Sequence, residues 1–454
     1  MSLLRDVDHV AIIGAGFSGT LAAINLQRFG GPRVTLIEDR SEAGCGLAFG
    51  SAHPTHLLNV RAARMSAFPD DPGHLVRWLE ARGVPEPATA FIPRLLYGEY
   101  LRELLDSTLA QGDSVQLVHG KVSDASHDGN EAVLRLMDGA VLRADAAVLA
   151  IGNLPPHAPS GLELEGLPGD LCAGDPWASD VADGLTGSDT VLILGTGLTM
   201  VDVALMLDKR GFRGKIVAMS RRGLIPHVHG TQSPPAEPLT ERPSGAVSGI
   251  VRQVRARADA IGWRDAVDEL RPFTQGMWRA ASLSEQARFL RHLRPWWDVH
   301  RHRIAPQVTE DLTRMEEEGR LKTFSGRPFK FTGYDGVRVD WQPRGSDTPQ
   351  TLHVRRVINC TGPLGDLLRS TDPLLRALRE RGDARPDVLH LGIDVDQQSR
   401  TINAVGRSND WLYALGPMTR GAFWEIVAVP DIRTQVWALA RKLANAHWVG
   451  GEGL

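Results

Sequence analysis

Residues 8–40, "DHVAIIGAGFSGTLAAINLQRFGGPRVTLIEDR", begin with an apolar run, pass through three glycines and continue with helical periodicity. The apolar run at 10–13 predicts a strand of a buried parallel sheet. Gly14 permits a tight turn, Gly16 lets a pyrophosphate approach the backbone, and Gly19 lets the helix pack closely on the strand. The stretch therefore predicts a strand, glycine turn and helix that bind a dinucleotide at the helix N-terminus.

The next apolar run, "RVTLIE" (33–38), ends on Glu38, about 20 residues after the glycines, as the dinucleotide fingerprint requires. A carboxylate at this point accepts hydrogen bonds from the hydroxyl groups of an unmodified ribose. We therefore assign the first dinucleotide site to Gly14, Gly16, Ser18, Gly19, Glu38 and Asp39.

Residues 188–222, "SDTVLILGTGLTMVDVALMLDKRGFRGKIVAMSRR", repeat this pattern with a different ending. Met200 replaces the third glycine, which predicts slightly wider packing of the helix on the strand. An arginine pair follows the next strand and matches a ribose 2′-phosphate, which a carboxylate would repel. The alternative is that the pair covers a solvated strand end. We assign the second site, for a 2′-phosphorylated dinucleotide, to Gly195, Gly197, Thr199, Arg221 and Arg222.

Composition limits the class of partner. The chain has 454 residues, which is long enough for two or three domains, and a formal net charge of −3. This balance gives no reason to expect nucleic acid or an anionic membrane as a partner, so we expect small molecules. The apolar run near the N-terminus leaves no room for an export signal, and we expect a cytoplasmic protein. The three cysteines lie far apart and form no metal-binding or redox pair.

After the second copy, two further stretches each place a glycine-containing loop after an apolar run. They are "RRVINCTGPLGD" (355–366) and "WLYALGPMTRGAFWEIVAVPDIRTQVWALARKLA" (411–444). This organisation resembles the flavoproteins with two dinucleotide-binding domains. The stretches "HLLNVRAARMSAFPDDPGHLVRWL", "LGTGLTMVDVAL", "LRPWWDVHRHRIAP" and "LGPMTRGAFWEI" are similar to bacterial FAD/NAD(P)-binding proteins near the N-hydroxylating and Baeyer-Villiger flavin monooxygenases. The resemblance implies an α/β fold of two Rossmann-like domains, an FAD domain (1–155 and 357–454) split around an NADPH domain (156–356) that carries a helical insert at about 246–312.

The resemblance also implies further site residues. The segments at 145–156 and 357–362 correspond to crossovers between the domains, which adds Gly152 and Gly362 to the cofactor-binding set. Many relatives end the last strand in Gly-Asp, whereas Gly416 is followed here by proline. We therefore expect the loop 416–423 to hold the flavin through backbone N–H groups and a helix N-terminus near Phe423. Arg420 either adds positive charge there or is a surface arginine.

Residues 49–65 follow the ribose strand and, by their position in the resembled fold, approach the flavin ring. His53, His56 and Asn59 are candidates for ring or substrate contacts, with structural hydrogen bonding as the alternative for the histidines. We take Asn59, His56 and Arg420 as the catalytic candidates and expect no metal site. In the insert, Arg288, Arg291, Arg294, Arg301 and Arg303 are candidates for binding a substrate carboxylate or NADPH phosphates. The alternative is a solvated basic face above a core of tryptophans.

Three functions fit these observations. The first is an NADPH-dependent FAD monooxygenase that uses molecular oxygen on a small polar metabolite, at an amine nitrogen in the resembled enzymes. The second is an NADPH-dependent flavin reductase or dehydrogenase without oxygen insertion. The third is a flavin-bound redox sensor or binding protein. The substrate and the oligomeric state are not encoded in any motif.

Overall fold

The computed structural model describes residues 7–158, 162, 164, 166–230, 239–363 and 365–445. The chain forms two compact units. The first comprises Met1–Ala52, Val60–Leu154 and Leu364–Leu454, and the second comprises His53–Asn59 and Pro155–Pro363. Residues 357–363 lie in the second unit, unlike the boundary expected at 356/357, because the strand at Arg356–Asn359 pairs within the second sheet.

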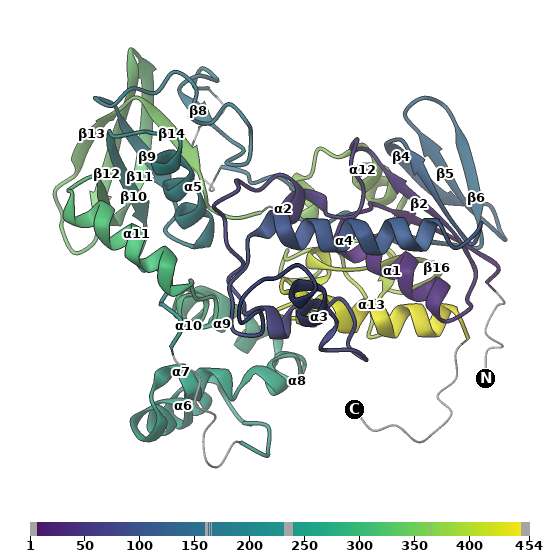
Figure 1. Ribbon diagram of the computed structural model, residues 1–454. Coiled ribbons are helices and arrows are strands. Elements are labelled where there is room, and N and C mark those ends of the chain that lie inside the picture. The colour runs from purple at the N-terminus through teal and green to yellow at the C-terminus, as the bar shows by residue number, and fades with distance from the viewer. Residues whose placement is uncertain are drawn as a thin grey trace. The chain divides into compact units, whose positions relative to one another are not determined.

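The first unit is built on a six-stranded sheet in the order β15-β16-β7-β1-β2-β3. Figure 1 labels β2 and β16 of this sheet. Its strands are β1 (His9–Ile13), β2 (Arg33–Glu38), β3 (Val115–His119), β7 (Ala146–Leu149), β15 (Arg400–Ile402) and β16 (Ser408–Ala414). All neighbours are parallel except β15 and β16. The central strand β7 is buried at every residue, as expected for a parallel strand with both faces covered.

Helices cover this sheet and a small antiparallel sheet extends it. Helix α1 (Phe17–Arg28) packs against both α13 (Val429–Leu443) and α4 (Arg94–Leu109), and α12 (Pro373–Arg381) packs against β4 (Val122–His127). The three-stranded sheet consists of β4 (Val122–His127), β5 (Ala132–Leu136) and β6 (Val141–Ala144). The helices are α1 (Phe17–Arg28), α2 (Gly46–Gly50), η1 (Ala62–Arg64), α3 (His74–Glu80), α4 (Arg94–Leu109), η3 (Leu367–Arg369), α12 (Pro373–Arg381), η4 (Pro417–Thr419) and α13 (Val429–Leu443).

The second unit is built on a seven-stranded sheet in the order β13-β12-β11-β10-β9-β14-β8. Its strands are β8 (Cys172–Ala173), β9 (Thr190–Leu194), β10 (Lys215–Ser220), β11 (Leu321–Tyr334), β12 (Gly336–Pro343), β13 (Gln350–Val354) and β14 (Arg356–Asn359). The strands from β8 to β11 are parallel, and β12 and β13 add an antiparallel edge. Helix α5 (Leu198–Lys209) follows β9, as α1 follows β1.

The predicted insert is helical. It contains α6 (Val247–Ile261), α7 (Trp263–Asp268), η2 (Arg271–Phe273), α8 (Thr274–Ala280), α9 (Leu283–His292) and α10 (Arg294–Arg301). The next helix, α11 (Pro306–Glu317), contacts α5 and β11 and so belongs to the nucleotide-binding layers rather than to the insert. Among the described residues, no helix combines the length and the hydropathy needed to cross a bilayer.

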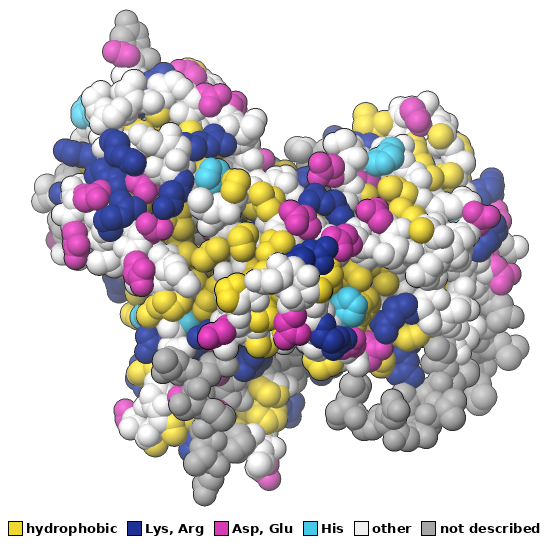
Figure 2. Space-filling view, viewed as in Figure 1, with side chains coloured by type: hydrophobic (Ala, Val, Ile, Leu, Met, Phe, Trp, Pro, Cys, Tyr) yellow, Lys and Arg dark blue, Asp and Glu magenta, His cyan; other side chains and the backbone are white. Residues whose placement is uncertain are grey.

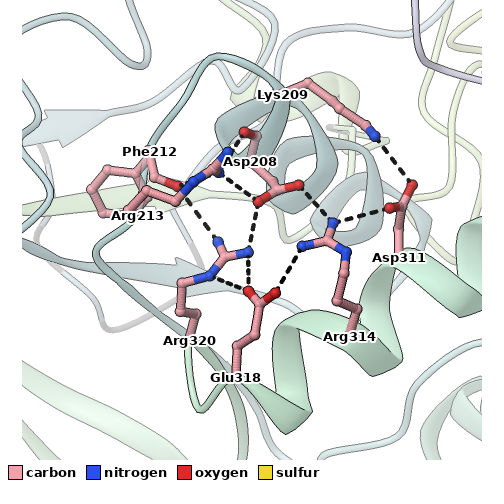
Figure 3. A network of polar contacts seen from close by, with 8 residues as sticks. All are labelled: Asp208, Lys209, Phe212, Arg213, Asp311, Arg314, Glu318 and Arg320. Carbon is pink, nitrogen blue, oxygen red and sulfur yellow. Dashed lines mark hydrogen bonds and ion pairs between the residues drawn. The ribbon is translucent and has the colours of Figure 1, made fainter.

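One buried carboxylate joins the layers of the second unit (Figure 3). Asp208, near the end of α5, has a side chain that is only 4% exposed. Its Oδ1 accepts from Arg213 at 2.8 Å and from Arg320 at 2.7 Å, and its Oδ2 accepts from Arg314 at 2.8 Å. Burial raises the pKa of Asp208, but the hydrogen bonds from Arg314 and Arg320 outweigh it and hold that pKa below its ordinary value.

This network fixes α11 and the start of β11 to α5. Glu318 completes it by accepting from Arg314 at 3.3 Å and from Arg320 Nε at 2.7 Å. Figure 2 shows basic and acidic side chains intermingled over this part of the second unit, where α5 and α11 lie. Loss of the Asp208 charge is costly chiefly at Arg320, which is 11% exposed and keeps only Glu318 as an anionic partner among the described residues.

We expect Asp208→Asn to lower the free energy of unfolding of the second unit by about 3 kcal/mol. The control, Asp311→Asn, removes a carboxylate that is 31% exposed and pairs with Lys209 and Arg314, and should cost less than about 1 kcal/mol. Urea midpoints at pH 7 measure both effects.

The difference in stability between the wild type and Asp208→Asn should depend on pH. Because the folded-state pKa of Asp208 is lowered, its stabilisation is complete above the ordinary carboxyl pKa and is lost as the pH falls through the folded value. The stability difference between the wild type and Asp208→Asn should therefore shrink below about pH 4. A difference that stays constant from neutral pH to pH 3 would show that the carboxylate charge is unimportant.

Candidate functional site

The first glycine turn lies between β1 and α1. Gly14 has φ +100°, and a Cβ on this residue would lie 2.6 Å from the main-chain oxygen of Ala150, so only glycine fits. Its N–H donates to Ile37 O at 2.8 Å, which ties the turn to β2. A Cβ on Gly16 would meet nothing closer than 3.6 Å. The turn thus needs Gly14 for its own geometry, whereas Gly16 leaves space for a ligand at the start of α1.

The second glycine turn, between β9 and α5, has the same geometry. Gly195 has φ +107°, and a Cβ on it would lie 2.4 Å from Cys360 O. Its N–H donates to Met219 O at 2.8 Å. A Cβ on Gly197 would meet no heavy atom within 4 Å, so this glycine too is required by nothing in the protein itself. Both turns therefore present an open helix N-terminus suited to phosphate.

The third position differs between the copies. A Cβ on Gly19 would fall 1.8 Å from Gly14 O, so α1 lies directly against its turn. The corresponding residue of the second copy is Met200, which is fully buried. The Cβ of Met200 cannot lie at such a distance from a carbonyl oxygen. Helix α5 therefore lies farther from its turn than α1 does, in the direction that the sequence predicts.

The strand register corrects the sequence comparison of the two copies. Ile13 is paired with Ile37 in the first sheet and Leu194 with Met219 in the second. Glu38 therefore corresponds to Ser220, and the arginine pair begins one residue later than we expected. From the sequence we placed the arginine pair at the position of Glu38, because both follow a strand and both are charged. The pairing of the strands shows that Ser220 occupies that position.

Ser220, the last residue of β10, carries no charge. Its hydroxyl contacts Thr196 Oγ1 at 2.8 Å and accepts from the N–H of Gly223 at 3.0 Å. Arg221 follows it and is exposed, and Arg222 is half-buried. The strand end of the second copy thus carries no carboxylate and two adjacent guanidinium groups, as a 2′-phosphate requires.

Glu38 is buried at the end of β2, with its carboxylate directed to the first turn. Oε2 accepts from the N–H of Ala15 at 2.7 Å and Oε1 accepts from the N–H of Arg40 at 3.1 Å. Burial raises the pKa of Glu38, and the neighbouring Asp39 raises it further, while the two N–H groups oppose the change. Each oxygen keeps a further lone pair, so the group can still accept from ribose hydroxyl groups.

The loop after β16 is held from inside the first unit. Gly416 N–H donates to Gln435 Oε1 at 2.8 Å, and Phe423 N–H donates to Thr419 O at 3.0 Å. These two amides are therefore engaged within the protein, and the expectation that backbone N–H groups of the loop 416–423 hold the flavin stays a prediction. Helix α13 begins at Val429, not near Phe423, because Glu425 has φ +70° and Pro430 fits the first helical turn.

A buried aspartate supports the same loop, and sequence analysis did not single it out. Asp387 accepts from the N–H groups of Leu389 at 2.9 Å and Gly392 at 2.8 Å. A Cβ on Gly421 would lie 2.5 Å from Asp387 Cγ. Ile393 N–H donates to Met418 O at 2.7 Å. The segment at 387–393 thus shapes the loop at 416–421, where Arg420 lies half-buried.

The segment His53–Asn59 belongs to the second unit. His56 is buried, and its Nδ1 accepts from His53 N–H at 3.2 Å, so its Nε2–H donates to Asp202 O at 2.9 Å. Both ring nitrogens are therefore engaged, which supports the structural alternative for His56. Asn59 is half-buried; its main-chain oxygen accepts from His229 Nε2 at 2.9 Å. Its side-chain amide makes no hydrogen bond to another described residue.

The insert arginines are largely engaged in local pairs. Arg288 pairs with Glu285 at 2.7 Å, and Arg303, which is buried, pairs with Asp268 at 2.8 Å. Arg294 lies 3.5 Å from Asp298, Arg291 is exposed and Arg301 is half-buried. The exposed Arg288 and Arg291 fit a solvated basic face, whereas the buried Arg303 does not. The tryptophans do not all form a core beneath it, because Trp263 and Trp296 are 45% and 44% exposed.

The other predicted positions lie at strand or helix ends. Ser18 is buried in the first turn of α1, beside Gly416 of the loop after β16. Thr199 is half-buried in the first turn of α5. Gly152 follows β7 and Gly362 follows β14, and a Cβ on either would meet no heavy atom within 4 Å. Among the described residues, no group of three His, Cys, Asp or Glu side chains could hold a metal ion.

The two turns have the geometry of dinucleotide sites, and a family model identifies the first. Residues 11–154 match the FAD-NAD(P)-binding family. The match covers the end of β1, the glycine turn, α1 and Glu38, and it confirms the prediction of a dinucleotide-binding segment here. No curated protein matches the sequence.

Solved structures resemble the whole chain. The ornithine N-hydroxylase of Kutzneria sp. 744, solved with reduced FAD, NADP+ and L-ornithine, is 17% identical with a TM-score of 0.63, covering 97% of this chain and 99% of that one. The cadaverine monooxygenase of Erwinia amylovora, bound to FAD, is 11% identical (TM-score 0.68; 97% and 95% covered). The thioredoxin reductase of Lactococcus lactis is 14% identical (TM-score 0.53; 97% and 99% covered). These likenesses confirm the predicted fold.

Substitution of the second glycine of each turn should impair nucleotide binding without impairing folding. We expect Gly16→Ala to abolish or strongly reduce bound FAD, and Gly197→Ala to weaken NADPH binding, because each methyl group would occupy the space for a pyrophosphate. Both variants should fold, since neither methyl group meets protein atoms closer than 3.6 Å. Flavin absorbance and NADPH titration measure the two effects.

The matched controls are Gly14→Ala and Gly195→Ala, whose methyl groups would lie 2.6 Å and 2.4 Å from carbonyl oxygens. These variants should lose thermal stability as well as binding. Normal FAD content in Gly16→Ala together with normal NADPH affinity in Gly197→Ala would contradict the assignment of both turns.

Proposed function

We propose that this chain is an FAD-dependent monooxygenase that takes its reducing equivalents from NADPH and hydroxylates the amine nitrogen of a small polar substrate. In the overall reaction NADPH supplies two electrons, one atom of O2 enters the substrate N–H to give a hydroxylamine, and the other leaves as water. FAD, when bound, supplies the redox chemistry between NADPH and oxygen.

The observation that carries this proposal is the pair of glycine turns with matched backbone geometry and different strand ends. The first turn is followed by the buried carboxylate of Glu38, which fits the free ribose of FAD. The second is followed by Ser220 and two arginines, which fit the 2′-phosphate of NADPH. A protein with both sites is built to bring a hydride donor and a flavin together within one chain.

The amine substrate and the oxygen are the finer part of the proposal. It is supported by the ornithine and cadaverine hydroxylases among the structures of similar fold. The thiol chemistry of a thioredoxin reductase has no support, because Cys45, Cys172 and Cys360 are unpaired and far apart in the sequence. Burial raises the pKa of Cys45 and Cys360, so neither thiol is activated.

The chain's own residues have distinct roles in this proposal. Glu38 binds the adenosine ribose of FAD, and Arg221 binds the 2′-phosphate of NADPH. Asn59 remains the candidate for contact with the amine substrate, since its side-chain amide is not engaged by the described residues. Arg420 is the candidate for positive charge at the flavin, on a loop that Asp387 supports. His56 positions the segment that carries Asn59.

We expect the wild type to oxidise NADPH much faster than NADH at low concentration, and Arg221→Ala to raise the KM for NADPH about tenfold or more while leaving that for NADH unchanged. Arg252→Ala, which removes an exposed arginine of the insert, should leave both constants unchanged. Equal use of both nucleotides by the wild type would show that the arginine pair only covers the strand end.

The decisive assay measures how much hydroxylamine and how much hydrogen peroxide are formed for each NADPH that is oxidised. A panel of diamines and basic amino acids should contain a compound that accelerates NADPH oxidation and yields close to one hydroxylamine per NADPH. Release of hydrogen peroxide in proportion to NADPH, unchanged by every amine, would favour a reductase without oxygen insertion. Absence of repeated turnover with any acceptor would favour a flavin-bound sensor.

A further inference from the structure

An exposed tryptophan lies beside the arginine pair of the second unit. The guanidinium carbon of Arg222 is 5.9 Å from the ring centroid of Trp296, within the range of a cation–π contact. Trp296 lies on α10, and 44% of its surface is exposed. A large aromatic ring held beside an arginine and open to solvent is suited to stacking on a planar ligand.

The position of Trp296 is fixed by the backbone of the nucleotide-binding layers. The segment that follows Arg222 pairs with the end of α10 and the residues after it. His227 N–H donates to Val299 O at 3.1 Å, Ile304 N–H donates to His227 O at 2.9 Å, and His229 N–H donates to Ile304 O at 3.0 Å. These backbone hydrogen bonds join the end of α10 to the segment that follows β10 and the arginine pair.

This place corresponds to the adenosine end of a bound dinucleotide. In a Rossmann unit the ribose of the adenosine lies at the end of the second strand, and here that strand is β10, which ends at Ser220. Arg222 lies two residues beyond Ser220, so the adenine attached to that ribose is within reach of a side chain beside Arg222. The purine ring has a π face that stacks on tryptophan.

We propose that Trp296 and Arg222 form a clamp for 2′-phosphoadenosine, in which the arginines hold the 2′-phosphate and the indole stacks on the adenine. This inference rests on the proposed NADPH site of the second unit and assigns its affinity and specificity in part to the helical insert. The basic insert then contributes to nucleotide recognition through one aromatic ring, rather than through the arginines that sequence analysis selected.

The insert supplies a matched control. Trp263, on α7, is 45% exposed, like Trp296, but its described ring partner is His300, at a centroid distance of 5.5 Å, and not Arg222. Trp263→Ala therefore removes an exposed indole of the same insert that reaches α10 through His300, whose Nδ1 lies 3.0 Å from Trp296 O, and not through the indole of Trp296 or Arg222. Trp296→Phe keeps an aromatic face and distinguishes stacking from a general loss of structure.

The experiment is calorimetric titration of the full-length protein with 2′,5′-ADP and with 5′-AMP, neither of which requires turnover. Trp296→Ala should weaken both ligands by about tenfold, because both carry adenine. Trp296→Phe should recover most of the affinity, and Trp263→Ala should bind as the wild type does. Arg221→Ala should weaken 2′,5′-ADP and leave 5′-AMP unchanged, because only the former has a 2′-phosphate.

The outcomes separate the clamp from the function on which it rests. If the wild type binds 2′,5′-ADP and Trp296→Ala binds it equally well, the clamp is wrong and the NADPH site stands. If Trp296→Ala and Trp263→Ala weaken binding equally, the effect is structural and the clamp is also wrong. If the wild type does not prefer 2′,5′-ADP to 5′-AMP, the proposed NADPH site fails and the clamp fails with it.

Discussion

Both units depend on one close approach between backbone segments. The first glycine of each turn lies against the carbonyl group at the end of a neighbouring strand, Ala150 O in the first unit and Cys360 O in the second. A side chain at Gly14 or Gly195 would separate the turn from that strand and displace the following helix. This approach brings the helix N-terminus to the carboxyl edge of the sheet, where Glu38 or the arginine pair is placed. The phosphate and ribose sites that we propose lie along this edge.

The two copies differ where they recognise a ligand and agree where they build the turn. Each first glycine donates to the end of the next strand at 2.8 Å, and each has φ close to +100°. One residue beyond the matched pair, the first copy has Glu38 and the second has Ser220. Charge at the strand end therefore distinguishes the two sites, while the backbone that presents the phosphate is held constant. The clamp that we propose adds a second level of recognition, through Trp296 beside Arg222.

The sequence predicts the parts of this structure that depend on local rules. Strand, glycine turn and helix were predicted at both copies, because the spacing of glycines and apolar residues is a local property. The helix start at Val429 was not predicted, since it depends on the backbone of Glu425, whose positive φ has no signature in its residue type. Asp387 was missed because its partners are backbone amides of its own loop and its neighbour is Gly421, contacts that only folding creates. The grouping of His53–Asn59 with the second unit depends on the bond from His56 to Asp202, 146 residues away in the chain.

We propose that one chain holds two different dinucleotides at two separate glycine turns, FAD at the first and NADPH at the second. Amide hydrogen exchange followed by mass spectrometry locates each nucleotide directly. Adding FAD to flavin-stripped protein should slow exchange in peptides covering residues 14–20 and leave those covering 195–201 unchanged. Adding NADP+ to the flavin-loaded protein should slow exchange at 195–201 and at 220–224. Protection of the same turn by both nucleotides, or protection of neither turn, would contradict the account.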